Sequence, residues 1–91
     1  MASPAGKLLL FGATGDLAQR MLIPSLYGLH ADGLLPEGLT ITGTARSDHD
    51  DAGYREFARA ALDEHLPTDR KDAAAIETFL TRLHYQPLDA S

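Results

Sequence analysis

The chain has 91 residues, 44% of them hydrophobic and 23% charged, which is the composition of one small globular domain. Lys and Arg number 8 against 13 Asp and Glu, so the formal net charge is -5, and no basic segment favours a nucleic-acid partner. Cysteine is absent, which excludes disulfides, thiol catalysis and cysteine-bound metals. No apolar stretch is long enough for a signal-peptide core or a membrane span. These features predict a cytoplasmic protein with no membrane partner.

The N-terminal part of the sequence predicts a leader and then a buried strand. Residues 1–6 carry no pattern and are expected to form a loose leader, followed by one domain over residues 7–91. Lys7 to Phe11 is a short apolar run that ends at a glycine. Such a run is typical of a strand that is buried on both faces of a sheet.

A helix is predicted from Asp16 onward, because the apolar residues change to helical spacing. They recur at i, i+4 and i+7, in Leu22, Leu26 and Leu29. Pro24 has no N–H for the helix hydrogen bond, so a kink is expected near Ile23. Gly33 is the expected C-terminal cap.

A second strand and a second helix follow the return loop. The stretch LTITGTA, residues 39–45, is rich in β-branched residues and predicts a strand. Asp48, Asp50 and Asp51 suit the start of a helix, where carboxylates meet free N–H groups and the helix dipole. That helix should end before Pro67. Its apolar stripe comprises Tyr54, Phe57, Ala58, Ala61 and Leu62.

Thr68 is predicted to cap a third helix, and residues 84–89 are expected to begin a third strand. The apolar stripe of the third helix comprises Ile76, Phe79, Leu80 and Leu83. The order β-α-β-α-α-β predicts an α/β fold with a Rossmann-like, doubly wound parallel sheet, of which this is the N-terminal portion. Such a sheet should carry helices on both faces and further strands at its edges, so the sequence predicts the first piece of a longer domain.

The stretch GATGDLA, residues 12–18, lies between the first strand and the first helix, which is where a dinucleotide-binding fingerprint is found. Gly12 allows a tight reversal of the chain, and Gly15 leaves room for a pyrophosphate beside the backbone. Ala18 occupies the third fingerprint position, where a small residue lets the helix pack against the strand. A glycine turn alone is weak evidence, because it also fits a simple connection.

The start of the first helix offers donors to a phosphate group. The N–H groups of Asp16 and Leu17 should point at the phosphates with the positive end of the helix dipole behind them. The Thr14 hydroxyl can donate to the same oxygens. The Asp16 carboxylate would repel a phosphate, so a structural N-cap is the favoured role for that side chain.

Arg46 and Ser47 follow the second strand, at the position where an NAD site has Asp or Glu for the ribose 2'-hydroxyl. A guanidinium can bind a 2'-phosphate through two hydrogen bonds, so this pair favours NADP. The alternative is that Arg46 is an ordinary surface residue. Asp48 weakens the signal slightly, although it is assigned to the helix start.

No other pattern in the sequence indicates chemistry. The histidines, His30, His49, His65 and His84, lack the spacing of metal ligands. No arrangement of nucleophile and base is recognisable, so no catalytic residue and no metal site are predicted.

The stretches GATGDLAQRMLIPSLYGLHADGLLPE and ITGTARS closely resemble the N-terminal segment of the glucose-6-phosphate dehydrogenase family, and the resemblance covers residues 7–90. It implies an enzyme that oxidises glucose 6-phosphate to 6-phosphogluconolactone and passes hydride to NADP in the pentose phosphate pathway. Separately, a homo-oligomer is expected, because a three-stranded parallel sheet with one face poorly covered should be marginal alone. The coenzyme-binding residues that the resemblance implies are Gly12, Ala13, Thr14, Gly15, Asp16, Leu17, Ala18, Gln19, Arg46 and Ser47.

Two departures from the family pattern matter. Family members commonly have Lys where this chain has Met21, so residue 21 is left out of the site. Family chains are also several times longer, and their catalytic His motif and sugar-phosphate site would lie beyond Ser91. The 91-residue chain is therefore expected to be inactive alone. Two alternatives stay open: an NADP-binding reductase or regulator of the extended short-chain type, and a non-enzymatic α/β interaction domain.

Overall fold

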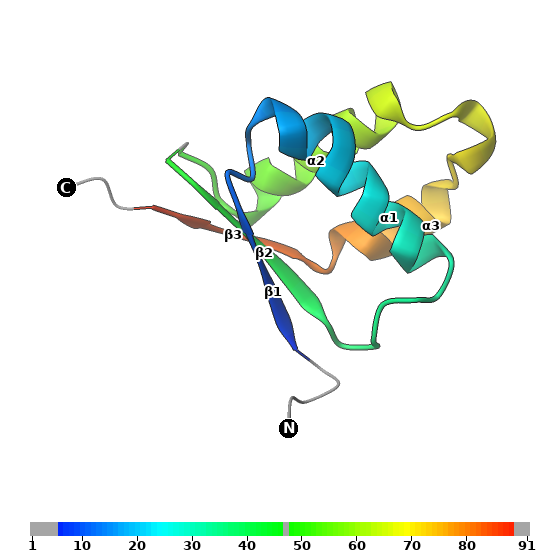
Figure 1. Ribbon diagram of the computed structural model, residues 1–91, viewed down its shortest axis with the longest axis horizontal. Helices are drawn as coiled ribbons and strands as arrows, with labels where there is room; N and C mark the ends of the chain where they lie inside the picture. The colour runs from blue at the N-terminus through cyan, green and yellow to red at the C-terminus, as the bar shows by residue number, and fades with distance from the viewer. Residues whose placement is uncertain (1–5, 47, 89–91) are drawn as a thin grey trace.

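The computed structural model describes residues 6–46 and 48–88. Its strands β1 (Lys7–Phe11), β2 (Thr40–Ala45) and β3 (Leu83–Pro87) form a parallel sheet in the order β1-β2-β3 (Figure 1). The helical segments are η1 (Ala18–Leu22), α1 (Ile23–Ala31), α2 (Asp51–His65), η2 (Thr68–Arg70) and α3 (Ala73–Leu80). The expected β-α-β-α-α-β order and the parallel sheet are confirmed.

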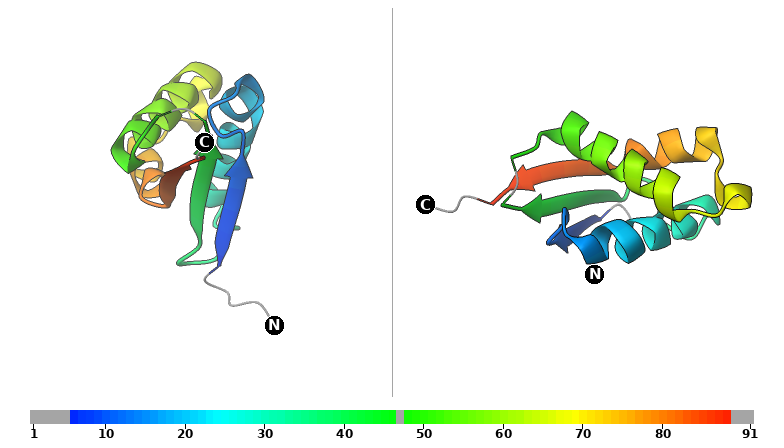
Figure 2. Two further views of the ribbon diagram at one scale, coloured as in Figure 1. Left: turned by 90° about the vertical axis from the view of Figure 1, so that its left-hand side faces the viewer. Right: turned by 90° about the horizontal axis from the view of Figure 1, so that it is seen from above.

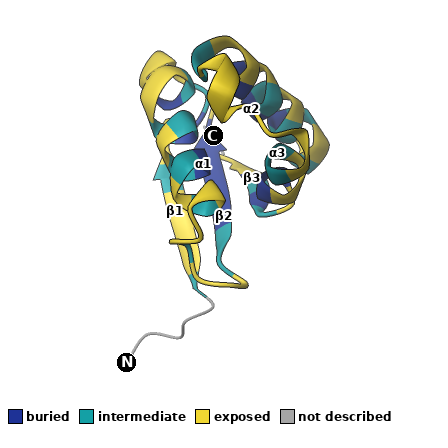
Figure 3. Cartoon of the chain, turned by 90° about the vertical axis from the view of Figure 1, so that its right-hand side faces the viewer, coloured by how far each residue is buried: buried dark blue, intermediate teal, exposed yellow. Residues whose placement is uncertain are grey.

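A whole doubly wound sheet is expected to carry helices on both faces, and in the described residues, which form its N-terminal portion, the helices pack on one face (Figure 2). The reason is topological: strands placed in the order 1-2-3 extend the sheet in one direction, so two right-handed crossovers lie on the same side. Ile41, Leu83 and the other core residues face these helices. On the opposite face, Leu9 is 49% exposed and Phe11 is 68% exposed. The prediction that the first strand is buried on both faces is therefore wrong for the described part of the chain (Figure 3).

The two outer strands of the sheet differ in what covers their edges. Asp51 of α2 accepts a hydrogen bond from the Tyr85 N–H at 2.8 Å, and Arg55 donates to the Leu83 carbonyl at 2.9 Å. Pro87 has no N–H to offer. The edge of β3 is thus closed by α2, whereas within residues 6–46 and 48–88 the only strand that pairs with β1 is β2.

The first helix is interrupted next to Pro24, as expected. Its first turns include η1, a π-helical segment in which the Ile23 N–H donates to the Ala18 carbonyl, five residues back. This wider turn accommodates a proline, which has no N–H of its own for the helix ladder. Gly33 ends the helix with a φ of 73°, and the Leu34 N–H donates to the Leu29 carbonyl at 2.9 Å. This is the Schellman arrangement that Gly33 predicted.

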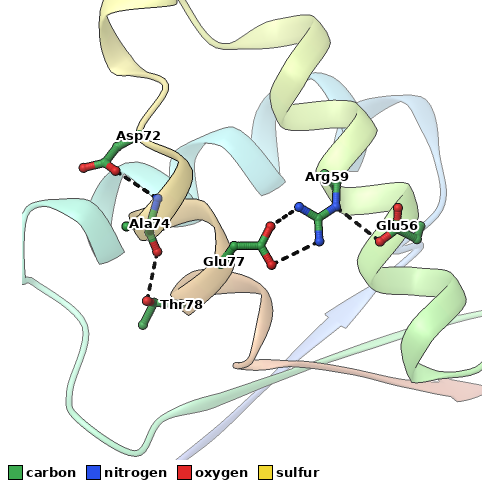
Figure 4. Close-up of polar contacts among 6 residues, drawn as sticks. All are labelled: Glu56, Arg59, Asp72, Ala74, Glu77 and Thr78. Atoms are coloured by element: carbon green, nitrogen blue, oxygen red, sulfur yellow. Dashed lines mark hydrogen bonds and ion pairs between the residues drawn. The ribbon is translucent and has the colours of Figure 1, made fainter.

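The second and third helices begin at aspartates. Asp50 caps α2 by accepting from the Gly53 N–H at 2.7 Å, and the apolar stripe of α2 lies in the core. The predicted cap at Thr68 is wrong, because Thr68 begins the short η2 segment. The cap of α3 is Asp72, which accepts from the Ala74 N–H at 3.0 Å (Figure 4). Asp72 has the extended backbone that an N-cap requires, and its carboxylate suits the helix dipole.

A surface ion pair joins α2 to α3. Arg59 of α2 donates to Glu77 of α3 and, within its own helix, to Glu56 at 3.2 Å (Figure 4). The side chains that make these contacts are largely exposed.

Candidate functional site

The glycine turn has the geometry that its glycines predict. Gly12 has a φ of 66°, in the left-handed region that only glycine adopts without strain. The Gly15 N–H donates to the Gly12 carbonyl at 2.9 Å and closes the turn. A Cβ on Gly15 would lie 3.2 Å from that same carbonyl oxygen, so a larger residue would disturb the turn.

Ala13 fastens the turn to the neighbouring strand. Its N–H donates to the Thr44 carbonyl of β2 at 3.1 Å, and its own carbonyl accepts from the Tyr54 hydroxyl at 3.1 Å. Ala13 is 0% exposed, so its side chain serves the core. Both backbone groups of this residue are thus held by the body of the protein.

The helix that follows the turn begins with exposed backbone. The Gly15 carbonyl accepts the first helix bond, from the Gln19 N–H, at 3.0 Å. Gly15, Asp16 and Leu17 are exposed, and Thr14 and Gln19 are half-buried. Ala18 is 1% exposed, which fits the close packing expected of a small residue at this position.

Asp16 does not play the capping role that the sequence favours. The structure places it inside the first helical turn, and its carboxylate pairs with Arg20 Nε at 2.8 Å. An i,i+4 pair of this kind stabilises the helix surface by a few tenths of a kcal/mol, about 0.3–0.5. The Gly15 backbone takes the N-cap position instead.

Arg46 is exposed at the carboxyl end of β2. The carbonyl of the preceding residue, Ala45, accepts from the Leu88 N–H at 2.8 Å and from the Tyr85 hydroxyl at 3.0 Å. Ser47 lies outside the described residues, so its predicted role stays a prediction. The segment after it lines an open hollow, through Asp48, His49, Asp50 and Gly53.

The sheet brings the two predicted segments together at one edge. Phe11 pairs with Thr44, so the glycine turn starts one residue beyond the pair and Arg46 follows two residues after it. The positive end of a helix therefore lies beside the end of the strand that bears a guanidinium. In parallel α/β sheets this carboxyl edge is where ligands bind.

Two residues at this edge have roles that the sequence did not indicate. Tyr54 was predicted as part of an apolar helix stripe, and Tyr85 as part of a strand. The structure shows that the phenol of each donates to a main-chain carbonyl next to the candidate site. A tyrosine among apolar core positions was the available signal, because a buried hydroxyl needs a partner. Burial raises the pKa of both phenols, which keeps them protonated and able to donate.

Elsewhere, the charged groups make structural contacts. The Asp51 carboxylate lies 3.0 Å from His84 Nδ1, and hydrogen bonds from His84 and the Tyr85 N–H lower the pKa of Asp51. Arg82 Nε donates to His30 Nδ1 at 3.0 Å, and burial together with the Arg82 charge lowers the pKa of His30.

Among the described residues no group of His, Asp and Glu could hold a metal ion. In that same part of the chain, no helix has the length and apolar character needed to cross a bilayer.

A glycine turn at a helix start, placed at the carboxyl edge of a parallel sheet beside a strand-end arginine, defines the chain as part of an α/β nucleotide-binding domain. Residues 9–91 match the family described as "Glucose-6-phosphate dehydrogenase, NAD binding domain". The chain belongs to this family.

Named relatives of the chain are glucose-6-phosphate 1-dehydrogenases. The chain is 49% identical over 89 residues to the glucose-6-phosphate 1-dehydrogenase of Zymomonas mobilis, and the match covers 98% of this chain and 18% of that protein. It is 44% identical over 80 residues to the Mycolicibacterium smegmatis enzyme, which covers 88% of this chain and 16% of the relative. The chain therefore spans less than a fifth of the length of these two relatives.

Solved structures show the same fold. A glucose-6-phosphate dehydrogenase in complex with its substrate glucose 6-phosphate matches 98% of this chain and 19% of its own, with a TM-score of 0.81 and 32% identity. The glucose-6-phosphate 1-dehydrogenase of Mycobacterium avium matches 96% of this chain, also at 32% identity, with a TM-score of 0.82. These likenesses favour the dehydrogenase over the extended short-chain reductase that the glycine turn alone left open.

Proposed function

We propose that this chain is the NADP-binding part of a glucose-6-phosphate dehydrogenase. The observation that supports this best is the hydrogen bond from the Ala13 N–H to the Thr44 carbonyl, at 3.1 Å. It ties the glycine turn to the end of β2, two residues before Arg46. One ligand with a pyrophosphate and a 2'-phosphate can then reach both segments.

The residues at the turn fit a pyrophosphate. Gly15 and Asp16 are exposed, and the N–H groups of the first helical turn, from Asp16 onward, precede the first internal helix bond. We assign the pyrophosphate site to the turn and the helix start, in the residues Gly12, Ala13, Thr14, Gly15, Asp16, Leu17, Ala18 and Gln19. Ala18 acts through its backbone, because its side chain is buried. Ala13 holds the turn in place and makes no direct contact, because its N–H and its carbonyl are both bonded within the chain.

Arg46, with Ser47 beside it, is the proposed 2'-phosphate site. An exposed guanidinium at the end of the second strand can hold a phosphate through two charge-assisted hydrogen bonds. When bound, NADP supplies the hydride acceptor for oxidation of a sugar hydroxyl. In the longer enzyme of which this chain would be the N-terminal part, the proposed substrate is glucose 6-phosphate and the proposed product is 6-phosphogluconolactone. The chain itself carries the coenzyme contacts.

A calorimetric titration of the chain with NADP and, separately, with NAD tests this proposal. We expect NADP to bind at least about tenfold more tightly, which corresponds to about 1.4 kcal/mol. Arg46→Ala should abolish this preference. Arg70→Ala is the matched control: it also removes one positive charge, but from η2, on the opposite side of the molecule from the carboxyl ends of the strands (Figure 1). The control should keep the preference.

Other outcomes of the titration would contradict parts of the proposal. Equal affinity for NADP and NAD would mean that Arg46 is a surface charge with no role in recognition. Binding of neither coenzyme would remove the proposed function from this chain. Gly15→Ala adds a further check, because its Cβ would lie 3.2 Å from the Gly12 carbonyl and narrow the approach to the backbone. Gly15→Ala should weaken the binding of NADP and the binding of NAD by the same factor.

A second candidate function is self-association through β1, consistent with an interaction domain or a homo-oligomer. The supporting observation is the exposure of Leu9 (49%) and Phe11 (68%) on the face of the sheet away from the helices. Sedimentation over a range of protein concentrations measures it. We expect Phe11→Lys to shift the chain toward monomer, and a monomer at all concentrations in the unaltered chain would contradict the idea.

A further inference from the structure

Each tyrosine of the chain donates its hydroxyl to a main-chain carbonyl far away in the sequence. The sequence has 3 tyrosines. Tyr27 donates to Arg70 at 3.2 Å, Tyr54 to Ala13 at 3.1 Å, and Tyr85 to Ala45 at 3.0 Å. The first bond braces η2. The other two end on the two segments that would contact the coenzyme.

Tyr54 and Tyr85 form one buried unit beneath that edge of the sheet. Their ring centroids lie 5.2 Å apart, and the residues are 0% and 6% exposed. Gly43 makes room for the Tyr54 ring, because a Cβ there would lie 2.8 Å from Tyr54 Cζ. The two rings pack as a unit, so the carbonyls to which they donate are held at a fixed separation.

We propose that Tyr54 and Tyr85 are positioning residues for coenzyme binding, Tyr54 for the pyrophosphate segment and Tyr85 for the 2'-phosphate segment. This inference rests on the function proposed above. Neither phenol touches the ligand. Tyr54 acts through Ala13, whose backbone is next to Thr14 and Gly15. Tyr85 acts through Ala45, whose backbone leads directly into Arg46.

The bond partners explain why a hydroxyl is needed at both positions. The Ala13 carbonyl is buried, and Tyr54 gives it a donor while the Ala13 N–H is used on Thr44. Without the phenol, this carbonyl would have to turn toward water, and the turn would rotate with it. The Ala45 carbonyl keeps one bond, from the Leu88 N–H, but loses the donor that fixes its direction. Preorganised donors bind a phosphate more tightly than mobile ones.

The test uses three matched variants, Tyr27→Phe, Tyr54→Phe and Tyr85→Phe, each of which removes one hydroxyl and keeps the ring. Titration with NADP and NAD should show that Tyr54→Phe weakens the binding of both coenzymes by a similar factor, about 3- to 10-fold. Tyr85→Phe should weaken the binding of NADP by about 3- to 10-fold and leave the affinity for NAD nearly unchanged. Tyr27→Phe should change neither affinity, although it loses the same kind of bond.

Amide hydrogen exchange without coenzyme gives a second readout that does not depend on binding. Tyr54→Phe should speed exchange at the Ala13 and Gly15 amides, and Tyr85→Phe should speed it at the Leu88 amide, whose acceptor is the Ala45 carbonyl. Tyr27→Phe should leave these amides unchanged. Faster exchange at every amide in all three variants would indicate general destabilisation and overturn the positioning role.

The outcomes separate this inference from the proposed function. Suppose that the unaltered chain binds NADP, and that the Tyr54 and Tyr85 variants bind each coenzyme as tightly as the unaltered chain does. The positioning role is then wrong and the proposed function stands. If the unaltered chain binds neither coenzyme, the proposed function and the positioning role fail together. Faster exchange confined to the named amides would then show only that the phenols brace the fold.

Discussion

Tyr54 of α2 and Gly43 of β2 share one space in the core. A Cβ built on Gly43 would lie 2.8 Å from Tyr54 Cζ and 2.7 Å from the Ala13 Cβ. The middle of the central strand therefore has glycine because a helix side chain and the glycine turn both approach it. The same contact lets the Tyr54 hydroxyl reach the Ala13 carbonyl.

Gly43→Ala should consequently destabilise the chain by about 1–3 kcal/mol, the usual cost of overpacking a core. Gly28→Ala is the matched control, because its Cβ would lie 3.6 Å from Arg70 Nη2, an ordinary contact. In a helix interior that change should be neutral or stabilising by up to about 1 kcal/mol. Urea unfolding of both variants measures the difference, and equal midpoints would refute the argument.

Asp72→Ala should cost about 1 kcal/mol of stability, because the carboxylate caps α3 through the Ala74 and Ala75 N–H groups. Thr68→Ala is the control. Thr68 is the cap that the sequence favoured, and it lies four residues before that position, in η2. Thermal unfolding followed by circular dichroism should show a lower midpoint for the Asp72 variant alone. A larger fall in the thermal midpoint for Thr68→Ala would mean that Thr68 is the helix cap, as the sequence predicted.

His30 should make the chain sensitive to mild acid. Because burial and the Arg82 charge lower the pKa of His30, the folded state favours the neutral ring, which accepts from Arg82 Nε. This contribution to stability is fully present above the usual value of 6.5 and is lost as the pH falls through the lower folded pKa. His30→Asn keeps an acceptor and cannot titrate. Its urea midpoint should fall less than that of the unaltered chain between about pH 7.5 and about pH 5; parallel curves would contradict this.

Asp51 should contribute stability that is also lost on acidification, but at lower pH than the contribution of His30. Its pKa is lowered by hydrogen bonds from His84 and the Tyr85 N–H, so its contribution is present above the usual value of 3.8 and is lost as the pH falls through the lower folded pKa. Asp51→Asn should therefore be less stable than the unaltered chain at about pH 6, by about 0.5–1 kcal/mol because the pair is half-exposed. The gap should close toward about pH 2.5. A gap of constant size would show that charge is not involved.

The Asp51 variant also tests how the sheet is bounded. The same carboxylate covers the Tyr85 N–H at the edge of β3. An Asn side chain can still accept from this N–H through its amide oxygen, so Asp51→Asn should not increase self-association. Sedimentation of this variant beside Phe11→Lys measures whether association uses β1 or β3. A rise in association in the Asp51 variant would indicate the β3 edge.

Local patterns determined most of the elements. The apolar run at Lys7 to Phe11 predicted a strand because it is short and continuous, and the run before Arg46 did so because it is rich in β-branched residues. The stripe of α2 predicted a helix, because burial on one face imposes a fixed period. Gly33 and Pro24 predicted a helix end and an interruption, since each acts through its own backbone. The glycine turn was recognisable for the same reason.

The tertiary structure decided what depends on neighbours distant in the sequence. Whether β1 is covered on both faces depends on which side the crossovers fall, and the run of leucines cannot report that. The cap of α3 moved from Thr68 to Asp72 because the chain first makes the η2 turn after Pro67. Asp16 forms an ion pair with Arg20, one helical turn further on, in place of the predicted cap. The reason is that the Gly15 backbone occupies the N-cap position.

The candidate site divides along the same line. The sequence by itself determined the glycine turn and the arginine after the second strand, because their chemistry resides in single residues and their spacing. Only the folded chain placed them at one edge of the sheet, through the bond from the Ala13 N–H to the Thr44 carbonyl. Only packing placed the phenols of Tyr54 and Tyr85 beneath the two segments, because a buried hydroxyl bonds to whichever carbonyl the fold presents.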